Sequence, residues 1–157
     1  MYESLQNFTQ SLPDALQWLG IMLISAIPFV ESYLGAAIGV VAGLPLFIAI
    51  PAAIVGNFAS MLIFVLVAHS ARQRIKGEQP ELSPRKQKIK GMFDRFGVPG
   101  VSLLGQWVLP SQITSSLMVS FGASKNAVIL WQTISIVLWG LGFGLLAHLG
   151  VTTLVGA

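Results

Sequence analysis

Cysteine is absent from this chain of 157 residues, and charge is scarce, since only 10% of the residues are Asp, Glu, Lys or Arg. The missing cysteines exclude disulfides, thiolate metal sites and cysteine nucleophiles. Soluble domains carry about a quarter of charged residues. The low charge, the 54% hydrophobic composition and the mean hydropathy of +0.76 therefore predict an integral membrane protein.

Several functional motifs are also absent from the sequence. It contains no phosphate-binding glycine motif, no nucleophile elbow and no paired carboxylates. His69 and His148 are the two histidines, and neither has a third ligand type nearby in the sequence. We therefore expect no enzyme, no cofactor, no metal site and no ATP-driven transport by this chain alone. Residues 1–12 contain no Lys or Arg and precede no cleavage pattern, so we expect the first apolar segment to be retained.

The apolar runs are continuous and about 25 to 30 residues long, which favours helices over membrane strands. The predicted fold class is all-α, a polytopic membrane protein with a single membrane domain over 1–157. We expect an interfacial helix over 1–14, a first repeat over 15–70, a basic cytoplasmic loop over 71–96 and a second repeat over 97–157. A frayed polar terminus is the alternative for 1–14.

Each half of the chain combines a broken segment with a clean span. Pro28 and Gly35 interrupt the first half and Pro110 interrupts the second, and the clean spans follow over 44–70 and 126–155. A shift of 79 positions places VVAGLP over VSFGAS and FVLVAHS over FGLLAHL. This register predicts two inverted repeats, each a re-entrant hairpin plus a transmembrane helix, as in many secondary transporters. Chance similarity between two apolar stretches is the alternative.

The basic residues predict the orientation. Eight of the nine Lys and Arg residues lie between Arg72 and Arg95, so this segment should face the cytoplasm, where it can also attract anionic lipids. With two hairpins, the N-terminus lies outside and Lys125 inside. With four full spans, the N-terminus lies inside and Lys125 outside.

Glu31 is the only charged residue between Ala15 and Ala71. A carboxylate at bilayer depth costs at least about 2.5 to 3.5 kcal/mol, so such a residue is a functional candidate by default. With its neighbours Ser32 and Tyr33, it could bind a cationic substrate or carry a proton. The alternative is a glutamate that only fixes the hairpin.

Uncharged polar residues provide the second set of candidates. Substrate contacts are expected at Asn57 in the first half and at Gln106, Ser111, Gln112 and Thr114 in the second. The alternative role is structural, because Asn57 could join two helices and the others could satisfy the backbone freed by Pro110.

The segments IPFVESYLGAAIGVVAGLP and AAIVGNFASMLIFVL resemble the bacterial small multi-drug export protein family. That family shows a Pro, Glu and small-residue pattern and then a Gly-Asn pair, which fall on Pro28, Glu31, Gly56 and Asn57. The family often has an Arg shortly after the Glu, where this chain has Tyr33. The resemblance implies an exporter in the bacterial cytoplasmic membrane.

The segment FDRFGVPGVSLLGQWVLPSQ resembles the wider DedA (VTT, SNARE-associated) superfamily. That superfamily is associated with two opposed re-entrant hairpins and with moving lipids, including prenyl phosphate carriers. Its two motif arginines fall on Gln106 and Gln112, and a neutral amide offers a phosphate no countercharge.

The isolated Glu31 and the repeated pattern favour a small secondary transporter, proton-coupled, with a midplane site centred on Glu31. The resemblance to the small multi-drug export family implies that it exports cationic or amphipathic compounds. A flippase of lipid phosphates such as undecaprenyl phosphate and a non-transporting assembly subunit are the open alternatives. Expected partners are membrane lipids, the substrate, protons and a second copy of the chain in a homodimer, and no nucleic acid.

Overall fold

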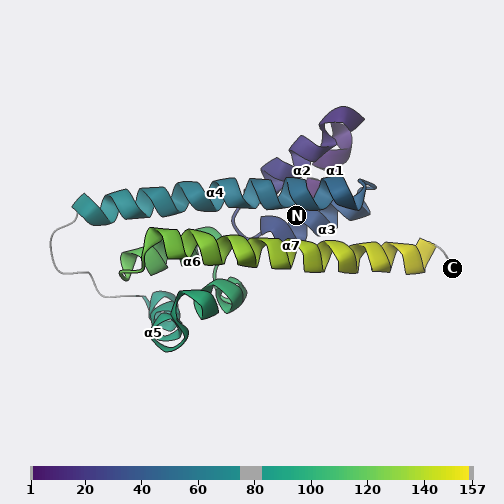
Figure 1. The fold of residues 1–157 in the computed structure, drawn as a ribbon. Helices are drawn as coiled ribbons and strands as arrows, with labels where there is room; N and C mark the ends of the chain where they lie inside the picture. Colours follow the sequence, from purple (N-terminus) through teal and green to yellow (C-terminus); the bar gives the residue numbers. More distant parts are fainter. Residues whose placement is uncertain (1, 75–82, 156–157) are drawn as a thin grey trace. The chain divides into compact units, whose positions relative to one another are not determined.

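The computed structural model describes residues 2–74 and 83–155, and every regular element within these two ranges is helical (Figure 1). This agrees with the predicted all-α class. The elements are α1 (Tyr2–Ser11), the 3₁₀ turn η1 (Asp14–Leu16), α2 (Gln17–Ser25), α3 (Glu31–Val41), α4 (Leu46–Arg74), α5 (Pro84–Leu104), the 3₁₀ turn η2 (Gly105–Trp107), α6 (Ser111–Ser120) and α7 (Lys125–Val155).

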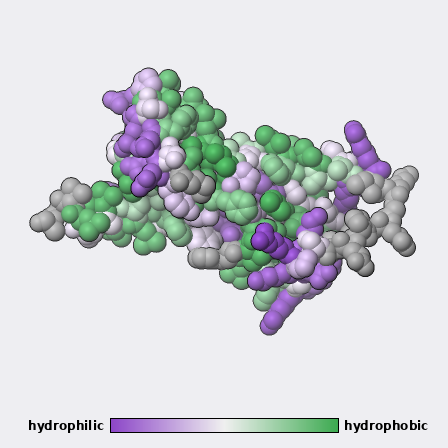
Figure 2. Space-filling view, turned by 180° about the vertical axis from the view of Figure 1, so that it is seen from behind, coloured by the Kyte–Doolittle hydropathy of each residue, from purple (hydrophilic) through white to green (hydrophobic). Residues whose placement is uncertain are grey.

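Two of these helices, α4 and α7, are long and apolar enough to cross a membrane. Only 44% of the most apolar stretch of α4 and 22% of that of α7 is buried inside the protein. A core helix of a soluble domain would be mostly buried. The surface in Figure 2 accordingly presents large hydrophobic areas, and the exposed apolar residues of α7 include Leu138, Leu146 and Leu154.

The chain forms two compact units. Unit 1 contains residues 1–59 and 136–157, and unit 2 contains residues 60–135. Both α4 and α7 contribute residues to each unit.

In unit 1, α2 and α3 pack against each other as a helical hairpin, and α1 packs against both. The turn between α2 and α3 contains Pro28, as the sequence predicted. The helical prediction for the N-terminal segment is also confirmed over Tyr2–Ser11, where a frayed terminus was the alternative. The buried apolar core comes from α2, α3 and the first part of α4, with Ile21, Ile24, Ala36, Ile38, Val40, Leu44, Ala49, Ile50, Ala52 and Ala53.

Gly35 does not break the helix, and that prediction was wrong. It lies inside α3, where a Cβ atom would overlap Oγ of Ser25 on α2. The missing side chain therefore allows the two helices of the hairpin to approach closely.

In unit 2, α5 is kinked at Gly97, whose φ of 64° lies in the left-handed region. The helix then packs against α6. Phe121, at the end of α6, contacts the ring of Phe93 at a centroid distance of 6.0 Å and lies 5.8 Å from Nζ of Lys90. The second half therefore also contains two helices that pack together, α5 of 21 residues with its kink at Gly97 and α6 of 10 residues.

The prediction of a loop over 71–96 was wrong for the described residues of this range, which are mostly helical. Helix α4 continues to Arg74 and α5 begins at Pro84, while residues 75–82 lie outside the described residues. Pro84 is tolerated because proline fits the first turn of a helix, where its missing N–H has no partner to lose. Lys90 and Asp94 form an ion pair at 2.6 Å, one helical turn apart, and this pair stabilises the helix.

The 79-residue correspondence reappears in the backbone. Helix α3 ends at Val41 and α6 ends at Ser120, and α4 begins at Leu46 while α7 begins at Lys125. The caps after α3 and α6 also match, because Gly43 and Gly122 have φ of 98° and 113°.

The hydrogen bonds of these two caps correspond one to one. The N–H of Leu44 donates to the carbonyl of Gly39 at 3.0 Å, and the N–H of Ala123 donates to that of Met118 at 3.0 Å. Both are Schellman caps, which place a glycine in the left-handed region after the last helical turn.

Gly140 and Gly144 on α7 serve packing within the chain. A Cβ at Gly140 would lie 3.0 Å from Ile54 and 3.3 Å from Ser32, and one at Gly144 would lie 2.6 Å from Ile50. These small residues therefore bring α7 close to α3 and α4 inside unit 1.

Candidate functional site

Glu31 lies at the turn between α2 and α3. Pro28 has no backbone N–H, so the helical hydrogen bonds of α2 end before it. Glu31 then begins α3, and its N–H donates to the carbonyl of Ile27 at 3.3 Å. Phe29 and Glu31 both have positive φ, 74° and 55°. Positive φ is rare for residues with a Cβ and costs of order 1–3 kcal/mol. Such strain is concentrated at functional sites, which makes this turn a candidate site.

The side chain of Glu31 is 1% exposed, and the neighbouring Ser32 is fully buried. Oγ of Ser32 donates a hydrogen bond to the backbone carbonyl of Ile136 on α7 at 2.8 Å. The segment that carries the carboxylate is thus fixed to a long helix of the same unit. A buried carboxylate on a fixed backbone can accept a proton or pair with a cation.

Tyr33 supports the turn and is partly exposed. Its hydroxyl donates to the carbonyl of Phe29 at 3.3 Å, and its ring packs edge-on against Phe143 at a centroid distance of 5.3 Å. Trp139 contacts the other side of this aromatic group, at 5.8 Å from Phe143. Tyr33 therefore stabilises the strained turn through its hydroxyl and lines it with aromatic surface.

Asn57 is fully buried on α4 in unit 1. It follows Gly56, where a Cβ would overlap the carbonyl oxygen of Met22 on α2. The close approach of α4 to α2 at this position places an amide inside the unit that holds Glu31.

The other predicted site residues lie in unit 2. Ser111, Gln112 and Thr114 are fully buried on α6. Oγ1 of Thr114 donates to the carbonyl of Leu109 at 3.1 Å, next to the break at Pro110. Ser115 and Ser116 donate to the carbonyl of Gln112 at 3.0 and 2.8 Å.

The bond of Thr114 lies beside Pro110 and fits the structural role considered above, whereas Ser115 and Ser116 donate to a carbonyl inside α6. The amides behave differently. Nε2 of Gln112 lies 3.5 Å from Oγ of Ser60 on α4, and Nε2 of Gln106 donates to Oγ of Ser135 on α7 at 3.2 Å. The two glutamines thus connect helices that are distant in sequence.

The sequence analysis missed Gln132 and Ser135 on α7 and Ser60 on α4. Gln132 and Ser135 are fully buried in unit 2. A signal for Gln132 was present, because after Asn126 it is the only carboxamide in the last apolar span. Its isolation in α7 parallels that of Glu31 in the first half.

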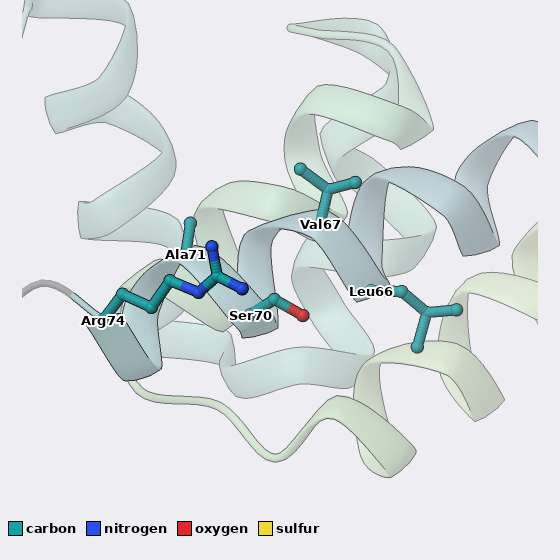
Figure 3. A pocket seen from close by; sticks show the side chains of 5 residues that line it. All are labelled: Leu66, Val67, Ser70, Ala71 and Arg74. Atoms are coloured by element: carbon teal, nitrogen blue, oxygen red, sulfur yellow. The ribbon is translucent and has the colours of Figure 1, made fainter.

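A pocket lies on α4 near its C-terminal end (Figure 3). Its lining is mainly apolar, with Leu66, Val67 and Ala71, and it also includes Ser70 and Arg74. The neighbouring Arg72 donates from Nη1 to the carbonyl of Val119 at 3.2 Å. This end of α4 thus presents a cation beside apolar surface.

Comparison with known proteins gave no match: no family model, no curated protein and no solved structure is similar to this chain.

Proposed function

We propose that this protein is a small secondary transporter that exports cationic or amphipathic compounds, with Glu31 as the group that accepts the cation or a proton. One observation carries the proposal. A carboxylate that is 1% exposed begins a short helix at a turn where two residues have positive φ. A buried carboxylate and a strained backbone are both costly, and they persist where function requires them.

The proposal includes a membrane topology. Helices of 9 and 11 residues, as in α2 and α3, are about 14 and 16 Å long and too short to cross a hydrocarbon core of about 30 Å. We propose that α2 with α3 forms one re-entrant hairpin and that the part of α5 after Gly97 forms the other with α6. We further propose that α4 and α7 cross the bilayer and that the two repeats are inverted.

In this topology the N-terminus faces outward, and the basic part of α5, before Gly97, faces the cytoplasm. The proposed location is the cytoplasmic membrane of a bacterium. Two spans enclose little space, so we further propose that the transporter works as a homodimer.

The experiment is uptake of ethidium into proteoliposomes under a pH gradient, with the wild-type chain and the Glu31→Gln variant. The neutral amide keeps the shape of the side chain but cannot bind a cation by charge or release a proton. We expect uptake at least tenfold above empty vesicles for the wild type and background uptake for Glu31→Gln. The Glu3→Gln variant, at an exposed position of α1, should transport like the wild type. Equal uptake by the wild type and Glu31→Gln would refute the role of Glu31.

Translocation of a lipid phosphate is the second candidate, and the pocket on α4 favours it. Its apolar lining suits an acyl or prenyl chain and Arg74 suits a phosphate. The same vesicles, with a labelled prenyl phosphate in one leaflet, test this candidate. Movement of the lipid without movement of ethidium would replace the first proposal by the second.

A further inference from the structure

A buried carboxamide in unit 2 has no role in the packing described above. Gln132 is fully buried, and neither Oε1 nor Nε2 of its amide has a hydrogen-bond partner in the described part of the chain. It lies seven residues after the start of α7, about 10 Å along the helix.

Two further buried polar atoms without partners lie on the neighbouring segment of unit 2. Ser135 is one helical turn after Gln132, on the same face of α7, and its Oγ accepts the hydrogen bond from Nε2 of Gln106. Oε1 of that glutamine and Oγ of Ser102, four residues before it, have no partner among the described residues. We call Ser102, Gln106, Gln132 and Ser135 the Gln132 cluster.

Buried polar side chains nearly always have a hydrogen-bond partner, so several exceptions in one cluster require an explanation. The cluster offers two carbonyl oxygens as acceptors, one amide nitrogen as a donor and one hydroxyl that can do either. An anion would be repelled by the two carbonyl oxygens. A cation would leave the amide nitrogen of Gln132 without a partner. A neutral hydroxyl can donate to one of the carbonyl oxygens and accept from the amide nitrogen, so it matches both kinds of group, and a water molecule has a second proton for the other carbonyl oxygen.

We infer that the Gln132 cluster binds a neutral hydroxyl group, supplied either by a water molecule or by the transported compound. The second source rests on the proposed function and deepens it, because it makes an uncharged hydroxyl part of what the transporter selects. Glu31 in unit 1 accounts for recognition of charge, and the Gln132 cluster accounts for recognition of a neutral polar group. The two sites need not be occupied at the same time.

The experiment compares two probes that differ by one hydroxyl, benzyldimethyl(2-hydroxyethyl)ammonium and benzyldimethylethylammonium. Uptake of an equal mixture into proteoliposomes is measured by mass spectrometry for the wild type, Gln132→Met and Gln87→Met. Gln87 is an exposed residue of α5 in the same unit and serves as the matched control. The hydroxylated probe should be preferred about fivefold by the wild type and by Gln87→Met, as one hydrogen bond allows. In Gln132→Met the preference should fall to about one, whereas Gln87→Met should keep both the preference and the wild-type uptake of the ethyl probe.

A high-resolution structure of the wild-type protein in lipid separates the two sources. Density within hydrogen-bond distance of Gln106 and Gln132, without a probe preference, assigns the site to water. A probe preference that disappears in Gln132→Met assigns it to the transported compound. The inference is overturned if the wild type shows no preference between the probes and the structure shows no density at the cluster. If neither probe moves with any protein, the proposed function fails, and the density alone decides whether the cluster binds a hydroxyl. If Gln132→Met does not fold, Gln106→Met tests the same cluster.

Discussion

Among single residues, Glu31 combines three unfavourable features. It is a carboxylate in an apolar segment, it is 1% exposed, and it has a φ of 55°. Most residues avoid that backbone region because Cβ crowds the following carbonyl oxygen, at a cost of roughly 1–2 kcal/mol. The hydrogen bonds of Ser32 to Ile136 and of Tyr33 to Phe29 hold the turn in this conformation.

The strain at the turn can be tested at Phe29, whose side chain is 57% exposed and whose φ is 74°. Phe29→Gly and Phe29→Ala both remove the ring and differ only in Cβ. We expect Phe29→Gly to be more stable than Phe29→Ala by about 1 kcal/mol, because glycine adopts positive φ without cost. Unfolding of the purified protein in detergent, followed by circular dichroism, measures the difference.

The control is Leu130, an exposed residue inside α7. At that position the order should reverse, with Leu130→Ala more stable than Leu130→Gly by roughly 0.5–1 kcal/mol. If the alanine variant is more stable than the glycine variant at both positions, Phe29 is not strained.

At the scale of elements, each half of the chain contains a pair of packed helices, α2 with α3 and α5 with α6, and then one long helix. The caps that end α3 and α6 determine where the long helices begin. Their agreement at a spacing of 79 residues includes the positive φ and both hydrogen bonds of the cap.

These caps lead to a second prediction. Gly43→Ala and Gly122→Ala should each destabilise the protein by about 1 kcal/mol, because alanine is disfavoured at positive φ. At Gly43 the added Cβ would have no atom within 4 Å, so the cost comes from the backbone alone. Chemical unfolding of the variants measures the loss.

Gly142 on α7 is the matched control, since a Cβ there also meets no atom within 4 Å but the backbone is helical. Gly142→Ala should be neutral or stabilising by roughly 0.5–1 kcal/mol. Equal effects at Gly43 and Gly142 would contradict the assigned caps.

The sequence predicted the elements that hydrophobicity and proline determine. The spans expected over 44–70 and 126–155 correspond to Leu46–Arg74 and Lys125–Val155, and the breaks occur around Pro28 and Pro110. Helix α5 was missed because prolines and glycines such as Pro84 and Gly91 indicated a loop, whereas Pro84 occupies the first turn of the helix and Gly91 lies inside it.

Side-chain partners were less predictable. Glu31 was identified as a candidate from its isolation in an apolar segment, and the same reasoning applied to α7 would have identified Gln132. The bonds of Thr114 to Leu109 and of Gln106 to Ser135 depend on which helices pack together. Local sequence does not contain that information.

At the scale of the whole molecule, orientation in the membrane is the first property to test. The natural chain has no cysteine, so single cysteines can be introduced without background. Ser4→Cys on α1 and Lys88→Cys on α5 are exposed positions. In intact cells, a membrane-impermeant maleimide should label Ser4→Cys, and it should label Lys88→Cys only after permeabilisation, because basic segments stay in the cytoplasm. Protection of Ser4→Cys in intact cells would support four full spans instead of two hairpins.

The central claim is that Glu31 couples the movement of a cation to that of a proton, and proton movement tests it most directly. Proteoliposomes with an acidic interior and the trapped pH dye pyranine are mixed with external ethidium. We predict that the internal pH rises with the wild-type protein and with Glu3→Gln, as protons leave in exchange for the drug, and that it does not change with Glu31→Gln. An equal rise of the internal pH with Glu31→Gln would contradict the account.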